Sequence, residues 1–188
     1  MADFFEITGA IIENARTYLP IGAKKAFVQE ALPHCIDTVS MQYEGQPLPD
    51  MAKESVENKQ KQLLGILAAG YLNINFEPID GTMWLMSDAD YDYLSSSHIL
   101  NQLERFKSNA ATRNKIFDLM QDYKLTEKLL NSEVYSAVAI QNDACTRLIA
   151  MVQSQSTPEY VQGMVSQLKE SLSQLGAYNL SKGGGANG

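Results

Sequence analysis

The chain has 188 residues, 45% of them hydrophobic and 20% charged, which suits a folded core and excludes a disordered or collagen-like chain. Its 22 acidic and 15 basic residues give a net charge of −7, which argues against binding nucleic acid by phosphate neutralisation. The N-terminus lacks the pattern of a secretion signal, and no apolar run has the length of a membrane-spanning helix. We therefore expect a cytoplasmic protein with neither a nucleic acid nor a membrane as its direct partner.

Hydrophobic residues at three- and four-residue steps predict helices at the start of the chain. Residues 5–19 form the first predicted helix. Residues 27–43 form the second, which Pro33 either kinks or divides into two shorter helices. The glycine and two prolines within residues 45–49 end this pattern.

A long third helix is predicted from Asp50, a good N-cap residue, to about Leu72. Its first half is polar and its second half is apolar, so the helix should begin in solvent and end in a core. Gly65 and Ala69 lie four residues apart, which would let another helix approach closely at that point.

Residues 73–95 follow a different pattern. Short extended pieces flank the dipeptide Asp80-Gly81, which is typical of a hairpin turn, so one small β-hairpin near residues 74–86 is compatible with this pattern. Pro78 would restrict the first piece to an edge strand. The segment contains five acidic residues and no basic residue, which makes it the most negative part of the chain.

Helical patterns occupy the rest of the chain. Further helices are predicted after the serines at 95–97, from Ser108, from a cap at Thr126 and from a cap at Thr157. In the last two helices the apolar residues alternate at four- and three-residue steps, which favours an antiparallel pair or a coiled-coil-like contact. The positions that form the seam of the final helix are Val161, Val165, Leu168, Leu172 and Leu175.

Gln141 occupies one position of the seam in the preceding helix, which otherwise carries apolar residues and Cys145. A polar residue on an apolar seam often fixes the register or the oligomeric state at some cost in stability. We predict that Gln141→Leu raises thermal stability and loosens the specificity of assembly. Together these patterns predict an all-α, single-domain bundle of about seven helices over residues 1–180, followed by a flexible Gly-rich tail at 181–188.

Three alternate aspartates, Asp88, Asp90 and Asp92, resemble the first ligands of a calcium-binding loop. The resemblance ends there, because Tyr93 takes the place of the turn glycine and Ile99 that of the bidentate glutamate. The favoured interpretation is a solvated acidic loop whose aspartates cap the next helix.

Aromatic residues surround this acidic segment, namely Trp84, Tyr91 and Tyr93. Amphipathic aromatic side chains beside charged ones are typical of protein-binding surfaces, so these three residues and the three aspartates form a candidate binding site. The alternative is that Trp84 covers the core beneath the loop.

No arrangement of nucleophiles, bases or metal ligands is visible in the sequence. The two cysteines, Cys35 and Cys145, are expected to be small buried residues, and their spacing from the two histidines matches no zinc site. His34 precedes Cys35 directly, so on a helix their side chains would point about 100° apart and could not form a catalytic pair. We therefore predict that the protein is not an enzyme and has no catalytic residue, cofactor or metal site.

These observations favour a non-enzymatic structural, assembly or adaptor protein that binds other proteins, including copies of itself. A compact acidic helical protein also suits a phage or another mobile element. One alternative is an acidic inhibitor or decoy that uses residues 73–95 to occupy the basic surface of a nucleic-acid-handling protein. Another is a small metal-dependent protein or enzyme that uses the three aspartates.

Overall fold

A computed structural model describes residues 5–43, 46–76 and 84–154, together with the helical positions 163, 166, 167 and 170. Contacts between Cα atoms divide the chain into two compact units. The helical unit comprises Met1–Cys35 and Val56–Asn131, and the hairpin unit comprises Ile36–Ser55 and Ser132–Gly188. The predictions of a single domain over residues 1–180 and of a flexible tail stay predictions.

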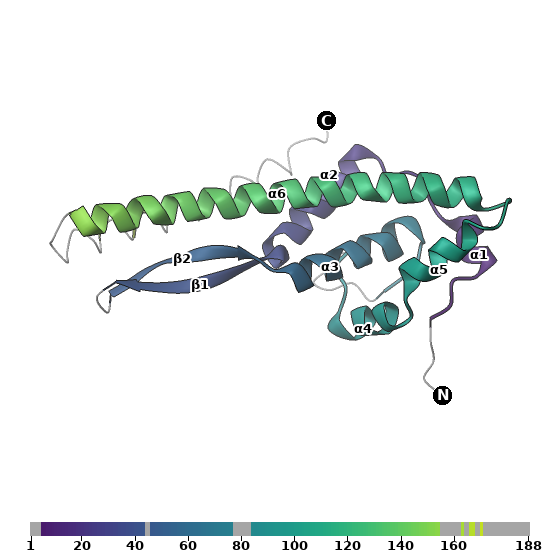
Figure 1. Ribbon diagram of the computed structural model, residues 1–188, viewed down its shortest axis with the longest axis horizontal. Coiled ribbons are helices and arrows are strands. Elements are labelled where there is room, and N and C mark those ends of the chain that lie inside the picture. The colour runs from purple at the N-terminus through teal and green to yellow at the C-terminus, as the bar shows by residue number, and fades with distance from the viewer. Residues whose placement is uncertain are drawn as a thin grey trace. The chain divides into compact units, whose positions relative to one another are not determined.

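The helical unit is built from short helices and the first part of one long helix (Figure 1). A 3-10 turn at Leu32–Cys35 and a π-helical segment at Ile66–Tyr71 extend two of the helices. The α-helices are α1 at Gly9–Asn14, α2 at Ile21–Ala31, α3 at Val56–Gly65, α4 at Asp88–Ser96, α5 at Ile99–Phe106 and α6 at Arg113–Ser154.

The hairpin unit contains two antiparallel strands, β1 at Ile36–Tyr43 and β2 at Gln46–Glu54, and the part of α6 from Ser132 onward (Figure 1). The register is regular from the pair Ile36 and Glu54 to the pair Val39 and Met51. Beyond that point Ser40 lies opposite two residues of β2, so the extra residue of a β-bulge belongs to β2.

Most of the described chain is helical, which confirms a mainly α fold, although this part of the chain has six α-helices rather than about seven. The prediction of a helix over residues 27–43 is wrong from Ile36 onward, where β1 begins. Ile36, Val39 and Tyr43 recur at helical steps, but the segment after Pro33 pairs with β2. The predicted third helix accordingly begins at Val56, because the residues from Asp50 to Glu54 belong to a strand.

The expected hairpin near residues 74–86 and the expected C-terminal helix pair fall partly outside the described residues. The hairpin expected near residues 74–86 lies largely outside the described residues, and its described flanks at 74–76 and 84–86 contain no strand. Of the predicted C-terminal helix pair, α6 is present, whereas nearly all of the second helix lies outside the described residues. Thr126 is not an N-cap, because α6 continues through it from Arg113.

The core of the helical unit is formed where α3 passes into its π-helical segment. Leu63 to Leu72 are buried except for Ala69, which confirms that the apolar half of this helix ends in a core. The close approach expected at Gly65 occurs, but the neighbour is a turn rather than a helix: a Cβ at Gly65 would lie 2.4 Å from the carbonyl oxygen of Trp84. Other fully buried side chains of this core are Ile12, Leu19, Phe27, Leu94, Leu103 and Ile116.

Over the residues that the structure describes, none of the helices combines the length and the apolar character needed to cross a bilayer.

Candidate functional site

Strand β2 is attached to α6 by side chains that bind its backbone. The amide of Asn142 accepts a hydrogen bond from Ala52 N–H at 2.8 Å and donates one to Ala52 C=O at 2.9 Å. Gln141 Nε2 donates to the carbonyl of Asp50 at 2.9 Å, and Cys145 Sγ donates to the same oxygen at 3.4 Å. Because Asp50 lies at the bulge, its carbonyl turns toward α6 and receives both bonds.

This attachment fixes the direction of the backbone groups in β1. Both polar groups of Ala52 point toward Asn142, so they point away from β1. Residues directly opposite each other in an antiparallel pair either exchange two hydrogen bonds or none. Thr38, which lies opposite Ala52, therefore directs its own N–H and C=O away from β2, toward the outer edge of β1.

The outer edge of β1 is unpaired within the described residues, because the sheet there has two strands only. The two strands differ in how their edges are protected. Strand β2 contains two prolines and Lys53, and α6 covers its edge. Strand β1 has neither proline nor lysine, and its one charged residue is Asp37. Proline, lysine and coverage are the usual means by which proteins block an edge strand, so β1 is the unprotected side of this sheet.

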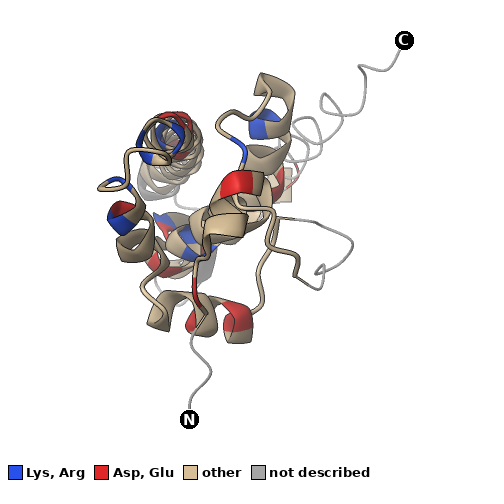
Figure 2. Ribbon diagram, turned by 90° about the vertical axis from the view of Figure 1, so that its right-hand side faces the viewer, with Lys and Arg blue, Asp and Glu red and all other residues tan. Residues whose placement is uncertain are grey.

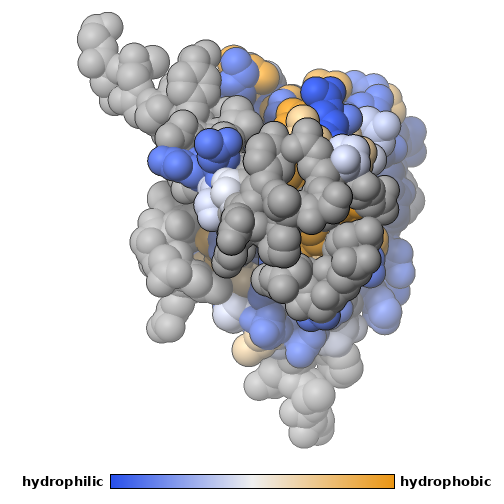
Figure 3. Space-filling model, turned by 90° about the vertical axis from the view of Figure 1, so that its left-hand side faces the viewer, coloured by the Kyte–Doolittle hydropathy of each residue, from blue (hydrophilic) through white to orange (hydrophobic). Residues whose placement is uncertain are grey.

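Several apolar side chains of the hairpin unit are exposed. Val39 on β1 is 47% exposed, and on α6 Tyr135 is 76%, Ile140 is 59% and Met151 is 47% exposed. The space-filling view shows hydrophobic residues at the surface among hydrophilic ones (Figure 3). On α6, Ile140 and Met151 lie about 160° and 180° around the helix from Asn142, which binds β2, so they face away from the sheet and Val39 alone of these four residues belongs to the open edge.

The three predicted aspartates lie on α4 and not in a loop. Ser87 is the N-cap, where its hydroxyl accepts from Asp90 N–H at 3.1 Å and donates to the Asp90 carboxylate at 2.6 Å. Asp88 forms an ion pair with Lys61, while Asp92 is exposed. Figure 2 shows α4, the lowest helix of Figure 1, with acidic residues and no basic ones. Two of the three acidic groups therefore have partners inside the chain.

Helical geometry separates the aspartates that a metal would have to bring together. On an α-helix Asp92 lies about 40° from Asp88, whereas Asp90 lies about 200° away, on the other side. In the part of the chain that the structure describes, no group of three or more His, Cys, Asp or Glu residues could hold a metal ion. The arrangement gives no support to a metal-dependent function for this segment.

The aromatic residues of the predicted binding site are placed apart in the fold. Trp84 is half-buried, and its ring lies against Gly70, where an added Cβ would be 3.1 Å from it. Tyr91 is half-buried and lines a pocket of about 440 Å³. Tyr93 is 42% exposed and meets the ring of Phe5 edge to face, with centroids 6.2 Å apart. Trp84 thus covers the core, which was the alternative interpretation, and the binding role of the six residues stays a prediction.

The helical unit contains a buried polar cluster that the sequence does not reveal. Lys24 Nζ donates to Asp122 Oδ1 at 2.5 Å, and Leu19 N–H and the Tyr71 hydroxyl donate to Oδ2, each at 2.8 Å. The Tyr71 oxygen also lies 2.9 Å from Thr126 Oγ1. Lys24 is 5% exposed and Asp122 is 7% exposed.

Electrostatics explain why this cluster is stable when buried. Burial by itself would raise the pKa of the Asp122 carboxyl, but the hydrogen bonds from Lys24, Leu19 and Tyr71 outweigh burial and lower it below its usual range. Burial also raises the pKa of Tyr71, so its hydroxyl remains a donor. Every charged group of the cluster has a partner, which is the arrangement of a structural ion pair.

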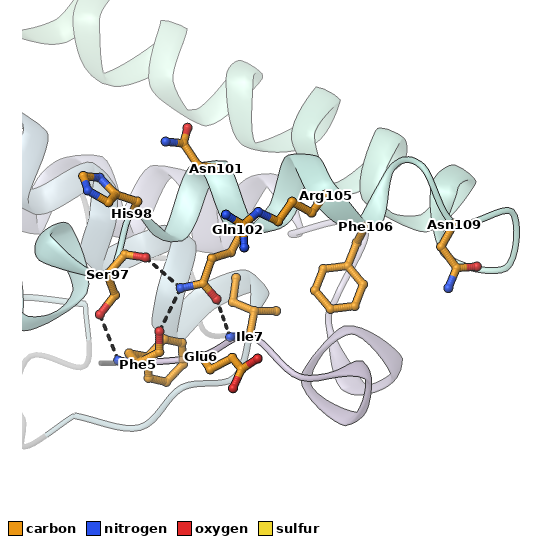
Figure 4. A pocket seen from close by; sticks show the side chains of 10 residues that line it. All are labelled: Phe5, Glu6, Ile7, Ser97, His98, Asn101, Gln102, Arg105, Phe106 and Asn109. Carbon is orange, nitrogen blue, oxygen red and sulfur yellow. Dashed lines mark hydrogen bonds between the residues drawn. The ribbon is translucent and has the colours of Figure 1, made fainter. Parts of the chain in front are cut away.

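A second pocket, of about 630 Å³, lies between the N-terminal segment and α5 (Figure 4). Gln102 is the centre of its hydrogen bonds: Oε1 accepts from Ile7 N–H at 2.6 Å, and Nε2 donates to Phe5 C=O at 2.8 Å and to Ser97 C=O at 2.7 Å. His98, the N-cap of α5, has a left-handed backbone with φ of 51° and lines both pockets. The polar groups on the floor of this pocket bind the chain's own N-terminal segment.

The structure describes only part of the predicted seam. Val161, Val165, Leu168, Leu172 and Leu175 all lie outside the described residues. Gln141 is described and binds a strand in its own chain, so a role in setting an assembly register stays a prediction. Cys35 and Cys145 are both buried, as expected. Burial, followed by the charge of Asp50, raises the pKa of the Cys145 thiol, which therefore stays protonated and acts as a donor.

Sequence reasoning missed the strands, and with them the open edge. The available signal was the β-rich composition of residues 36–43 followed by a segment that contains glycine and proline. Asn142 gave no signal of its own, because an asparagine beside an apolar seam is compatible with an exposed position. No protein-family model, curated protein sequence or solved structure matches this chain.

Proposed function

We propose that this chain is a non-enzymatic assembly or adaptor protein that acts through protein–protein contacts, including contacts with copies of itself. The observation that carries the proposal is the asymmetry of the hairpin unit. One edge of its sheet is bound by α6, and the other edge is unpaired within the described residues and lacks proline and lysine. An unprotected edge of this kind favours the addition of another strand.

The titratable groups of the helical unit support the non-enzymatic part of the proposal. Asp122, Lys24 and Tyr71 bind one another in the interior. In the pocket of Figure 4, Gln102 uses its polar atoms to bind the backbone, and the acidic and basic residues of the lining, Glu6, His98 and Arg105, are all exposed. Neither arrangement leaves a buried acid or base directed at a bound molecule.

The proposal is tested by the mass of the protein in solution. Light scattering on a sizing column, at several protein concentrations and at low and high salt, should give a multiple of 20.8 kDa. Salt should change this mass little, because backbone pairing and apolar contacts are weakly screened. A mass of 20.8 kDa under every condition would contradict self-association.

A matched pair of variants then locates the contact. Val39→Glu places a negative charge on the exposed face of β1 and should lower the observed mass. Val56→Glu makes the same change at a valine that is 56% exposed on α3, in the helical unit, and should leave the mass unchanged. Equal effects of both variants would show that the added charge, and not the strand edge, is responsible.

The acidic inhibitor is a second candidate, because Asp88 and Asp92 are exposed on α4, although Asp88 forms an ion pair with Lys61 and Asp90 a hydrogen bond with Ser87. It predicts binding to a basic protein that weakens steeply with salt and is lost when Asp88, Asp90 and Asp92 are all changed to Asn. Binding that is insensitive to salt would exclude it.

A further inference from the structure

We infer that β1 pairs in antiparallel orientation with β1 of a second copy of this chain, across a two-fold axis at Thr38. This inference rests on the proposed function, because it names the partner of the open edge. It joins the two hairpins into one four-stranded sheet in which β1 lies next to β1 and β2 occupies each outer position.

The backbone of β1 already has the arrangement that this pairing needs. The groups of Thr38 point outward, since Ala52, which lies opposite Thr38, directs its own N–H and C=O to Asn142. Two copies of Thr38 placed across a two-fold axis would exchange two N–H to C=O hydrogen bonds. The adjoining pairs would be Ile36 with Ser40 of the second copy, and the reverse. This register uses Ile36 to Ser40, and Ser40 is the residue of β1 that lies opposite the bulge of β2.

The side chains of β1 are compatible with the same register. Asp37, the one charged residue of the strand, lies across from Val39 of the second copy rather than from a second Asp37. The two aspartates become diagonal neighbours, and each already lies opposite Lys53 of its own hairpin. Two threonines face each other at the centre, which is a favourable cross-strand pair. The interface is short, so the dimer should depend on protein concentration.

A strand of a different protein is the other possible occupant of this edge, and the register distinguishes the two. A disulfide requires Cα atoms about 4.4–6.8 Å apart, and a hydrogen-bonded antiparallel pair has a separation of about 5.5 Å. Thr38→Cys should therefore form a disulfide-linked dimer under mild oxidation. Gln42→Cys, on the same strand, should not, because its two copies would be roughly 26 Å apart along the pair.

Oxidation of the unmodified chain measures any contribution of the two buried native cysteines. A dimer formed by Thr38→Cys alone supports the inference. The inference is overturned if Thr38→Cys and Gln42→Cys cross-link equally. It is also overturned if neither variant cross-links although the unmodified chain has a mass that is a multiple of 20.8 kDa, and in that case self-association itself stands. A single-chain mass together with no cross-link overturns both proposals.

Thr38→Pro provides an independent readout in the reduced protein. Proline removes the outward N–H of Thr38, which the hairpin itself does not use, so the pairing of β1 with β2 is retained. The observed mass should fall to 20.8 kDa while the thermal midpoint changes little. If Thr38→Pro leaves both the thermal midpoint and the mass of the assembled protein unchanged, the inference is contradicted. If the midpoint falls, the cysteine pair still decides the question.

Discussion

The side chain of Asn142 binds both backbone polar groups of Ala52, accepting from its N–H at 2.8 Å and donating to its C=O at 2.9 Å. A carboxamide has the donor and acceptor of a peptide group, so one side chain of a helix satisfies the strand as a neighbouring strand would. In the hairpin unit this contact covers the edge of β2 together with the bonds from Gln141 and Cys145 to the carbonyl of Asp50.

Removal of this contact should destabilise the hairpin unit. We expect Asn142→Ala to lower the free energy of unfolding by about 1–3 kcal/mol, because Ala52 is 6% exposed and would be left with unpaired polar groups. Asp143→Ala is the matched control: Asp143 is the next residue of α6 and forms an exposed ion pair with Arg147, so its loss should change stability by less than about 0.5 kcal/mol. Urea denaturation of both variants measures the difference, and equal values would contradict this role of Asn142.

The Asp122 cluster should make stability depend on acid. The folded protein holds the pKa of this carboxyl below that of the unfolded chain, which is about 3.9. Its contribution is therefore fully present above that value and is lost as the pH falls through the folded pKa. Thermal midpoints from pH 6 to pH 3 should fall less steeply for Asp122→Asn than for the unmodified chain. Asp118→Asn, at an exposed position of α6, should leave the slope unchanged.

The partner of Asp122 can be tested at neutral pH. Lys24→Met leaves a buried carboxylate without its cation and should cost about 3 kcal/mol or more. Combining Lys24→Met with Asp122→Asn should cost less than the sum of the single changes, because the two residues share one interaction. Additive losses in a double-mutant cycle would show that the two groups do not interact.

Two glycines should respond in opposite ways to the same substitution. An added Cβ at Gly65 would lie 2.4 Å from the Trp84 carbonyl oxygen, a backbone atom, so Gly65→Ala should destabilise the protein by about 1–3 kcal/mol. Gly22, near the start of α2, has no neighbour within 4 Å of such a Cβ. Gly22→Ala should therefore be stabilising by about 0.5 kcal/mol, because alanine restricts the unfolded chain. Thermal denaturation distinguishes the signs, and a loss at both positions would contradict the difference in packing.

Gln102 should determine how firmly the N-terminal segment is held. Its amide binds Phe5 and Ile7, so Gln102→Ala should speed hydrogen exchange at the Ile7 amide about fivefold, which corresponds to about 1 kcal/mol. Asn101→Ala changes the exposed neighbouring residue and should leave that rate unchanged. Exchange rates measured by mass spectrometry or NMR would contradict the prediction if both variants behaved alike.

Several helices could be predicted from the sequence because their apolar residues pack within the chain, but α4 was predicted as a loop and α1 occupies only residues 9–14 of the helix predicted over 5–19. The burial of Leu63 to Leu72 and the helix start at His98 follow from periodicity and from local residue preferences. The strands were missed for a physical reason. Ile36, Val39 and Tyr43 are spaced as on a helix, and the bulge interrupts the alternation of β2.

The candidate site was less predictable than the fold because it depends on long-range contacts. Asp50 was a plausible N-cap by local rules, but its carbonyl instead binds Gln141, 91 positions away. Likewise, Asp122 would pass for an exposed residue of α6, since neither Lys24 nor Tyr71 is near it in sequence. Local patterns do not contain these pairings, which form only when distant segments pack together.

The separation of Ala52 and Asn142 along the sequence also matters while the chain is being synthesised. The two residues are 90 positions apart, and a ribosome that adds about 5–20 residues per second needs roughly 5 to 20 s to make the second after the first. A two-stranded hairpin alone is only marginally stable in water. During that interval both edges of the sheet, rather than β1 alone, are open to neighbouring nascent chains.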